Sequence, residues 1–328
     1  MIRVGIIGTN WITNRLLNAA ALVKNFELAA VYSRTDEKAK EFAQKYGVEN
    51  TFTNLEEMAA SSLIDAVYIA TPNSYHADQA ILFLQNGKHV LCEKPLAANA
   101  KEVSEMIKCA KQHHVLLMEA MKSTLVPNFK VIQNNLYKIG TVRKFFSSYC
   151  QYSSRYDKYK EGIVLNAFNP IYANGALMDL GTYCLYPLIA LFKEPVDIKA
   201  TSIMLESGVD GEGSVLLQYE DKEAIVMYSK ISNSYLPCEI QGEKGSMIID
   251  KLHSPERVEI RYHDGTIEQL TVEQPYPVMY YEVKEFIDLI EQGRTESEIN
   301  SYENSYKTMQ VMDEVRRQIG LVYSSDHK

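Results

Sequence analysis

The sequence of 328 residues lacks several features that would place it in large classes of protein. It has only five cysteines, none of them in a C-x-x-C pair, which argues against a disulfide framework or a structural zinc site. No apolar run approaches the roughly 18 residues of a membrane-spanning helix. The N-terminus also lacks the basic, apolar and small-residue regions of a signal peptide. We therefore expect a soluble, cytoplasmic protein with reduced thiols, no membrane contact and no metal site.

An excess of positive charge is also lacking. The formal net charge is −8, with 34 Lys and Arg against 42 Asp and Glu, and no basic stripe is interleaved with aromatic residues. Nucleic-acid binding is therefore not expected. The hydrophobic share of 46% is ordinary for a globular protein, and the length favours two domains.

Strand and helix patterns alternate from the N-terminus to about Met121. Short apolar runs such as Ala66–Ala70 are each followed or preceded by stretches with helical spacing of apolar residues, such as Trp11–Lys24. This alternation predicts an α/β fold with a doubly wound parallel sheet that is covered on both faces. We predict a dinucleotide-binding domain over residues 1–121.

The remainder, residues 122–328, has a different pattern, and we expect it to bind substrate. Strand patterns between Val196 and Leu270 are separated by turn residues, which predicts an antiparallel sheet. The polar, tyrosine-rich stretch Tyr152–Glu161 is expected to be a mobile loop, and the last residues, Ser324–Lys328, to be frayed. Helices are expected at Tyr172–Phe192, Val278–Gln292 and Tyr302–Ile319.

The first strand ends in a turn that partly matches the dinucleotide fingerprint G-x-G-x-x-G/A. Gly8 supplies the tight turn, while Asn10 and Thr13 stand at the second and third small-residue positions. Asn10 departs from the pattern, although Asn tolerates positive φ better than most residues. The following helix would offer amide donors to a phosphate. A merely tight βα turn is the alternative, but the strand–turn–helix context favours a cofactor site.

The second strand ends at Ser33-Arg34, where NAD-binding sites usually carry a carboxylate for the ribose hydroxyls. A guanidinium is instead the natural partner of a 2′-phosphate. NADP(H) is therefore preferred over NAD(H), although Asp36 could still reach a ribose. The alternative is a solvated arginine at the start of a helix.

The strand Ala66–Ala70 leads into Thr71-Pro72-Asn73-Ser74-Tyr75-His76. These short polar groups at the carboxyl end of a strand are suited to contact ribose or nicotinamide. The alternatives are that Asn73 is an ordinary helix N-cap and that His76 is a surface residue.

Lys94 stands between Glu93 and Pro95, directly after the apolar run Val90–Cys92. Proline ends the strand and biases the residue before it to an extended conformation. Lys94 is thereby held at the carboxyl end of a strand, which is where open α/β sheets place their ligands. We interpret it as a substrate ligand, and a surface lysine with a salt-bridge partner is the alternative.

Asp179 and Tyr183 form a second candidate cluster. They are four residues apart, so they share one face of a helix. An acid and a phenol presented together suit proton transfer beside hydride transfer. The alternative is an amphipathic helix that buries Tyr183 with its hydroxyl satisfied.

Together these stretches resemble the family of glucose–fructose oxidoreductase, inositol dehydrogenase and dimeric dihydrodiol dehydrogenase, over nearly the whole chain. The E-K-P triplet at residues 93–95, followed by D-x-G-x-Y at residues 179–183, is the most diagnostic combination. The resemblance implies a Rossmann domain and a C-terminal domain with a large open, mainly antiparallel sheet, through which family members form dimers or tetramers. Related dehydrogenases often have an arginine where this chain has Thr124, and an aromatic residue where it has Lys122.

The resemblance also implies an activity, which is hydride transfer between nicotinamide C4 and a carbinol or carbonyl carbon of a sugar, polyol, dihydrodiol or related molecule. Lys94 would polarise the substrate oxygen and Tyr183 would act as acid and base, with a tyrosine as in the dihydrodiol and xylose dehydrogenase branch. Asp179 would orient substrate hydroxyls or the lysine. An NAD-dependent glycoside hydrolase and a non-catalytic nucleotide sensor of the same family are the alternatives. Cofactor contacts are expected from Gly8, Thr9, Asn10, Trp11, Ile12, Ser33, Arg34, Thr71, Pro72, Asn73, His76, Glu93 and Lys94.

Overall fold

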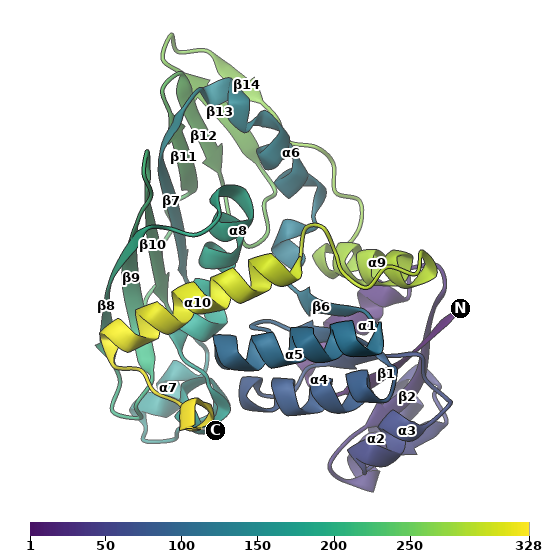
Figure 1. Ribbon diagram of the computed structural model, residues 1–328. Helices are drawn as coiled ribbons and strands as arrows, with labels where there is room; N and C mark the ends of the chain where they lie inside the picture. Colours follow the sequence, from purple (N-terminus) through teal and green to yellow (C-terminus); the bar gives the residue numbers. More distant parts are fainter. Residues whose placement is uncertain (328) are drawn as a thin grey trace. The chain divides into compact units, whose positions relative to one another are not determined.

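The computed structural model describes residues 1–327 (Figure 1). The described residues form two compact units. Residues 1–121 and 276–305 make up the first unit, and the second contains residues 122–275 and the chain from Tyr306 onward. The first unit thus includes a C-terminal segment in addition to the predicted nucleotide-binding region.

The first unit is built on a parallel sheet of six strands, counted over the described residues, in the order β3-β2-β1-β4-β5-β6. All of its neighbouring strands pair in parallel, so the predicted doubly wound sheet is confirmed. The strand order reverses between β1 and β4, and ligands of such sheets bind at the carboxyl ends of strands beside this point. The strands are β1 Ile2–Ile7, β2 Phe26–Tyr32, β3 Asn50–Phe52, β4 Ala66–Ile69, β5 His89–Glu93 and β6 Leu117–Ala120.

The helices of the first unit begin where short polar side chains accept backbone N–H groups. Asn10, Thr35, Asn54 and Asn99 each cap one helix in this way, which satisfies amides that have no partner within the helix. Helix α9 packs against α1, although they lie at opposite ends of the sequence. The helices are α1 Trp11–Ala20, α2 Asp36–Tyr46, α3 Leu55–Ala60, α4 His76–Gln85, α5 Ala100–His113 and α9 Val278–Glu291.

The second unit contains a sheet with eight described strands in the order β14-β13-β12-β11-β7-β10-β9-β8. Its strands pair antiparallel except for β7 and β10, which are parallel. The mainly antiparallel sheet expected from the turn signals is therefore confirmed. The strands are β7 Val142–Cys150, β8 Asp197–Met204, β9 Asp210–Gln218, β10 Glu223–Ser229, β11 Cys238–Gly242, β12 Gly245–Ile249, β13 Val258–Tyr262 and β14 Ile267–Gln269.

Helix α8, Thr182–Phe192, packs against β7 and β10 on one face of this sheet (Figure 1). It continues from a π-helical turn, Leu177–Gly181. The expectation that no apolar run approaches the length of a membrane-spanning helix is wrong for Pro170–Phe192, which is long and apolar enough by length and composition, with a mean hydropathy of 1.4. Because 78% of its apolar window is buried inside the protein, it is typical of a core helix. The unit also contains α6 Pro127–Asn135, α7 Tyr156–Lys160 and most of α10 Tyr302–Ile319.

Two segments expected to lack regular structure are ordered. Helix α7 lies within the stretch Tyr152–Glu161. At the C-terminus, residues Ser324–His327 form a 3-10 turn in which Asp326 accepts the backbone N–H of Tyr323 at 2.8 Å and pairs with Arg316. The prediction of a frayed end is therefore wrong for these residues, because a local carboxylate anchors them, and Lys328 lies outside the described residues.

Candidate active site

The turn after β1 is held by two residues of the partial fingerprint. Gly8 has φ +104, and a Cβ on it would lie 2.5 Å from the Ala70 carbonyl oxygen, so only glycine fits there. Asn10 has an extended backbone with φ −97, so it does not use the positive φ that Asn tolerates. Its Oδ1 accepts from the amides of Ile12 (2.9 Å) and Thr13 (3.3 Å), and its Nδ2 donates to Ala70 O at 2.7 Å. Asn10 therefore caps α1 and ties the end of β1 to that of β4.

The other residues of this turn divide into buried and exposed groups. Thr13 is fully buried, and its hydroxyl donates to Gly8 O at 2.6 Å, so it replaces the usual small residue without opening the turn. Trp11 is 59% exposed, with the Arg15 guanidinium 5.7 Å from its ring centroid. Thr9 and Ile12 are partly exposed. The turn thus presents backbone and one aromatic ring to solvent.

The end of β2 presents a cation. Ser33 is buried, whereas Arg34 is exposed. Thr35 caps α2 by accepting from the Lys38 amide at 3.4 Å. Asp36 forms an ion pair with Lys40 at 2.7 Å, so this carboxylate is engaged on its own helix. The arrangement suits an anionic group on the ligand more than a ribose hydroxyl.

The ends of β4 and β5 are joined through His76, which is fully buried. Its ring nitrogens lie 3.0 Å from Pro95 O and 2.9 Å from Thr71 O. The alternative of a surface histidine is therefore wrong. Burial lowers the pKa of His76, which favours the neutral ring. Asn73 is buried in a 3-10 turn before α4 and is not that helix's N-cap.

Lys94 follows directly on β5 and is partly exposed, with a cis peptide bond to Pro95. Two carboxylates hold its surroundings. Glu93 accepts from the Tyr68 hydroxyl at 2.6 Å, and Glu119 accepts from the Leu96 amide at 3.0 Å. Glu119 is 4% exposed, and burial raises its pKa to about 7. The turn that carries the lysine is thus fixed on both sides by groups at the carboxyl ends of neighbouring strands.

Asp179 lies in the π-helical turn that leads into α8. The fully buried Asp210 accepts from the amides of Ala176 (3.1 Å) and Leu177 (2.7 Å) at the start of this segment. Lys230 Nζ lies 2.7 Å from Asp179 Oδ2. Sequence reasoning missed both partners, because no local pattern links residues 51 positions apart.

Tyr183 is 8% exposed and belongs to an aromatic cluster. The Tyr149 ring meets it edge-on at 5.7 Å, and His253 stacks on Tyr149 with centroids 3.8 Å apart. Lys122 Nζ lies 5.2 Å from the centroid of the Tyr183 ring. Burial, with the Lys122 and Lys251 charges, lowers the pKa of His253 to about 4, so this imidazole is neutral near pH 7. The cluster confirms that Tyr183 is largely buried, and its catalytic role stays a prediction.

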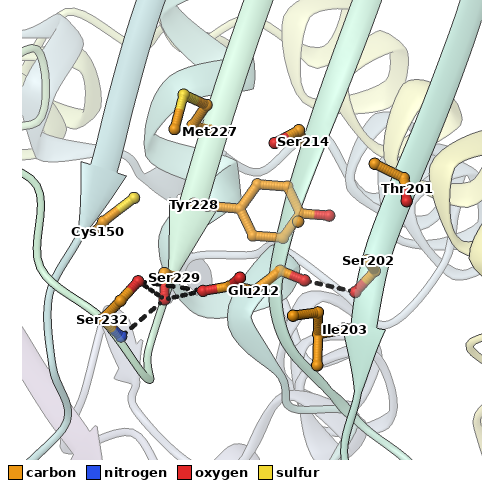
Figure 2. A pocket seen from close by; sticks show the side chains of 11 residues that line it. Cys150, Thr201, Ser202, Ile203, Glu212, Ser214, Met227, Tyr228, Ser229 and Ser232 are labelled. Atoms are coloured by element: carbon orange, nitrogen blue, oxygen red, sulfur yellow. Dashed lines mark hydrogen bonds between the residues drawn. The ribbon is translucent and has the colours of Figure 1, made fainter.

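The substitutions noted against related dehydrogenases differ in their surroundings. Lys122 contacts the candidate acid–base residue, as described above, while Thr124 is 1% exposed. A cavity of about 250 Å³ lies elsewhere, on the large sheet (Figure 2). There, Glu212 accepts hydrogen bonds from Ser229 and Ser232 at 3.1 Å each, and none of the predicted site residues lines it.

Comparisons with known proteins agree with this architecture. Residues 2–121 match the family model described as an oxidoreductase family with an NAD-binding Rossmann fold, and residues 136–248 match the GFO/IDH/MocA C-terminal domain. Two solved structures show the same fold. The 3-ketoreductase KijD10 of Actinomadura kijaniata has a TM-score of 0.82 at 24% identity and covers 97% of this chain and 98% of its own. Aldose–aldose oxidoreductase of Caulobacter crescentus has a TM-score of 0.85 at 22% identity, with 97% of each chain covered.

Sequence relatives extend over the whole length. Scyllo-inositol 2-dehydrogenase (NADP(+)) IolU of Bacillus subtilis is 56% identical over 326 residues, with 99% of each chain covered. Trans-1,2-dihydrobenzene-1,2-diol dehydrogenase of Xenopus tropicalis is 31% identical, covering 97% of this chain and 98% of its own. The chain belongs to the GFO/IDH/MocA family of oxidoreductases.

Proposed function

We propose that this protein is an NADP(H)-dependent dehydrogenase that interconverts a secondary carbinol and a ketone on a cyclic polyol. The observation that carries the proposal is the 56% identity over 99% of both chains with an enzyme named for scyllo-inositol and NADP(+). The relative named for a dihydrodiol likewise acts on a ring that bears hydroxyl groups. Scyllo-inositol is therefore the first substrate to test, followed by other inositols and trans-dihydrodiols.

The residues at the carboxyl ends of β1, β2, β4 and β5 fit a nicotinamide dinucleotide phosphate. The exposed Arg34 guanidinium offers bidentate contacts to a 2′-phosphate, while the Asp36 carboxylate pairs with Lys40. We assign the pyrophosphate to the Gly8–Ile12 turn, because it leads into the N-terminus of α1, which attracts negative charge. NAD(H) is the second cofactor to test. The nicotinamide side is assigned to Thr71, Pro72, Asn73, His76, Glu93 and Lys94.

The chemistry divides between three side chains. A bound NADP⁺ would supply the acceptor for the hydride of the carbinol carbon. The Lys94 ammonium stabilises negative charge that develops on the substrate oxygen. In oxidation the Tyr183 phenolate takes the proton of that oxygen, and in reduction the Tyr183 phenol returns it. Asp179 binds a further substrate hydroxyl.

We further propose a cytoplasmic homodimer or homotetramer that assembles through the large sheet. Side chains on one face of the strands are buried, whereas Phe146, Ile225 and Met227 alternate with them and stay partly exposed. Such a row of apolar side chains on a sheet face is typical of an interaction surface. Nucleotide binding is assigned to residues 1–121 and substrate binding and assembly to residues 122–328, with residues 276–305 supporting the nucleotide-binding unit.

The test is NADPH formation, followed by absorbance, when the purified protein is mixed with NADP⁺ and scyllo-inositol. Lys94→Ala should lower turnover about 10²–10³-fold, the usual effect of removing one electrostatic stabiliser. NADPH binding, measured by fluorescence titration, should change little. Lys108→Ala, at an exposed lysine of α5, is the matched control. Unchanged turnover in Lys94→Ala would overturn the role of Lys94.

The same assay separates the two alternatives. Cleavage of a glycoside without net NADPH formation would identify a hydrolase, and nucleotide binding without turnover of any polyol would identify a sensor. Neither outcome is expected, because a sensor needs no acid–base set and the named relatives are dehydrogenases.

A further inference from the structure

Lys230 is a buried cation that follows β10 and that the chemistry above does not use. Its side chain is 4% exposed. The ammonium lies 2.7 Å from Asp179 Oδ2, 3.4 Å from Ala167 O and 5.2 Å from the centroid of the Phe168 ring. Lysine is almost never this buried unless it is paired. The site therefore surrounds the ammonium with a carboxylate, a carbonyl oxygen and an aromatic face, each of which stabilises a positive charge.

The ion pair is asymmetric, because the Asp179 side chain is 39% exposed whereas that of Lys230 is 4% exposed. The cation lies inside the protein and the carboxylate lies at its surface. Lys230 is thus too deep to meet a small molecule, but Asp179 is accessible to one. A nearby cation favours the ionised form of a carboxyl group, and an ionised carboxylate only accepts hydrogen bonds.

The backbone of Asp179 is fixed independently of its side chain. Asp210 holds the start of the π-helical segment through two amides, at 3.1 and 2.7 Å. Short π-helical turns inside helices occur frequently at functional sites. Asp210 opens β9 and Lys230 follows β10, and these two strands pair with each other. The same strand pair therefore positions both the backbone and the carboxylate of Asp179.

We propose that Lys230 is a positioning residue that fixes Asp179 as a hydrogen-bond acceptor for a second substrate hydroxyl, beside the reacting carbinol. This inference rests on the proposed dehydrogenase function and names its substrate class, vicinal diols. Proton transfer then belongs to Tyr183 and not to Asp179. A site built to bind a hydroxyl rejects analogues that lack it, because its polar group is left without a partner.

The test compares trans-1,2-cyclohexanediol with cyclohexanol, which lacks the second hydroxyl, at saturating NADP⁺. The wild type should show a higher kcat/KM for the diol. Lys230→Met should lower kcat/KM for the diol about 10–100-fold, the range for losing a hydrogen bond to a charged group, and leave that for cyclohexanol within a few-fold. Lys230→Arg, which keeps the charge, should retain most of the preference. An equal fall for both substrates would show a merely structural role and overturn the proposal.

A control variant and a double variant complete this test. Lys222→Met removes a paired lysine at the opposite end of β10, with a side chain 17% exposed, and should leave the diol preference unchanged. Asp179→Asn combined with Lys230→Met removes both charges, so it should fold even if Lys230→Met does not. Its diol preference should be no lower than that of Asp179→Asn alone, and additive losses would overturn the coupling. Absence of NADPH formation with any polyol would instead overturn the proposed function itself.

Discussion

The two units of this protein position their candidate functional residues in different ways. In the nucleotide-binding unit, the ties that fix these residues are local or join the ends of neighbouring parallel strands. Asn10 contacts an amide two residues away and also the end of β4, and Glu119 links the end of β6 to the turn after β5. A doubly wound topology already brings these strand ends together. Motif and topology are therefore sufficient to predict where the candidate residues of this unit lie.

In the second unit, which contains the mainly antiparallel sheet, the corresponding contacts come from residues that no local pattern connects. Asp179 is paired with a residue 51 positions away, and the cap of its helical segment lies 33 positions away. These contacts depend on the register of β9 and β10 and on how α8 lies on the sheet. The same comparison predicts where single substitutions will act locally and where their effects will spread.

The largest expected effect is a loss of stability in the second unit, for Gly175→Ala. Gly175 has φ +148, and a Cβ there would lie 2.0 Å from Asp210 Oδ1. Backbone strain should cost about 1–3 kcal/mol. Disturbing the buried hydrogen bonds from the Ala176 and Leu177 amides to Asp210 should cost about 1–3 kcal/mol more. Both should lower the free energy of unfolding, measured by urea titration. Gly265→Ala, with φ +87 and no atom within 4 Å, has only the strain. Equal losses in the two variants would contradict the role of the cap.

A smaller and purely local effect is expected for Arg34→Ala in the nucleotide-binding unit. Truncating a charge-assisted hydrogen bond costs about 1.5–3 kcal/mol, so the KM for NADP⁺ should rise about 10–100-fold. The KM for NAD⁺ should change little, because NAD⁺ lacks the 2′-phosphate, and the midpoint of thermal unfolding should stay constant because Arg34 is exposed. An equal rise in KM for both cofactors would contradict the assignment of Arg34 to the 2′-phosphate.

The smallest expected effect is a change in the pH dependence of stability for Glu119→Gln. Burial raises the pKa of Glu119 from 4.5 to about 7, so its contribution is fully present below pH 4.5 and is lost as the pH rises through about 7. Glutamine keeps an acceptor for the Leu96 amide and does not ionise. The wild type should therefore lose on the order of 2 kcal/mol relative to the variant between pH 5 and pH 8.

Denaturant titrations at these two pH values would measure the difference. Comparing the variant with the wild type cancels the contributions of Asp210 and His253, which also titrate with shifted pKa values. Parallel pH profiles for the two proteins would show that Glu119 does not ionise in this range.

The sequence was sufficient for both sheets and for most helices, because their signals are periodic and local. It located Lys94 and the His76 turn, but it could not show that His76 is buried, since burial depends on the neighbouring strand end. The π-helical turn at Leu177–Gly181 could not be predicted either, because five residues are too few to give a periodic signal of their own. The role of Lys230 could not be predicted from the sequence, because a single lysine after a strand forms no pattern until its partner is known.

The path of the chain between the units determines how this fold can be divided. Over the described residues the chain passes from one unit to the other three times, after residues 121, 275 and 305. Asn300, from the returning segment, donates to the carbonyl oxygens of Glu119 (3.0 Å) and Met121 (3.1 Å) at the end of β6. A fragment that stops at Met121 would leave these carbonyls and the α1 face without their cover. Exchange of cofactor specificity between family members should therefore transfer residues 1–121 together with 276–305, and leave the intervening sheet in place as an insert.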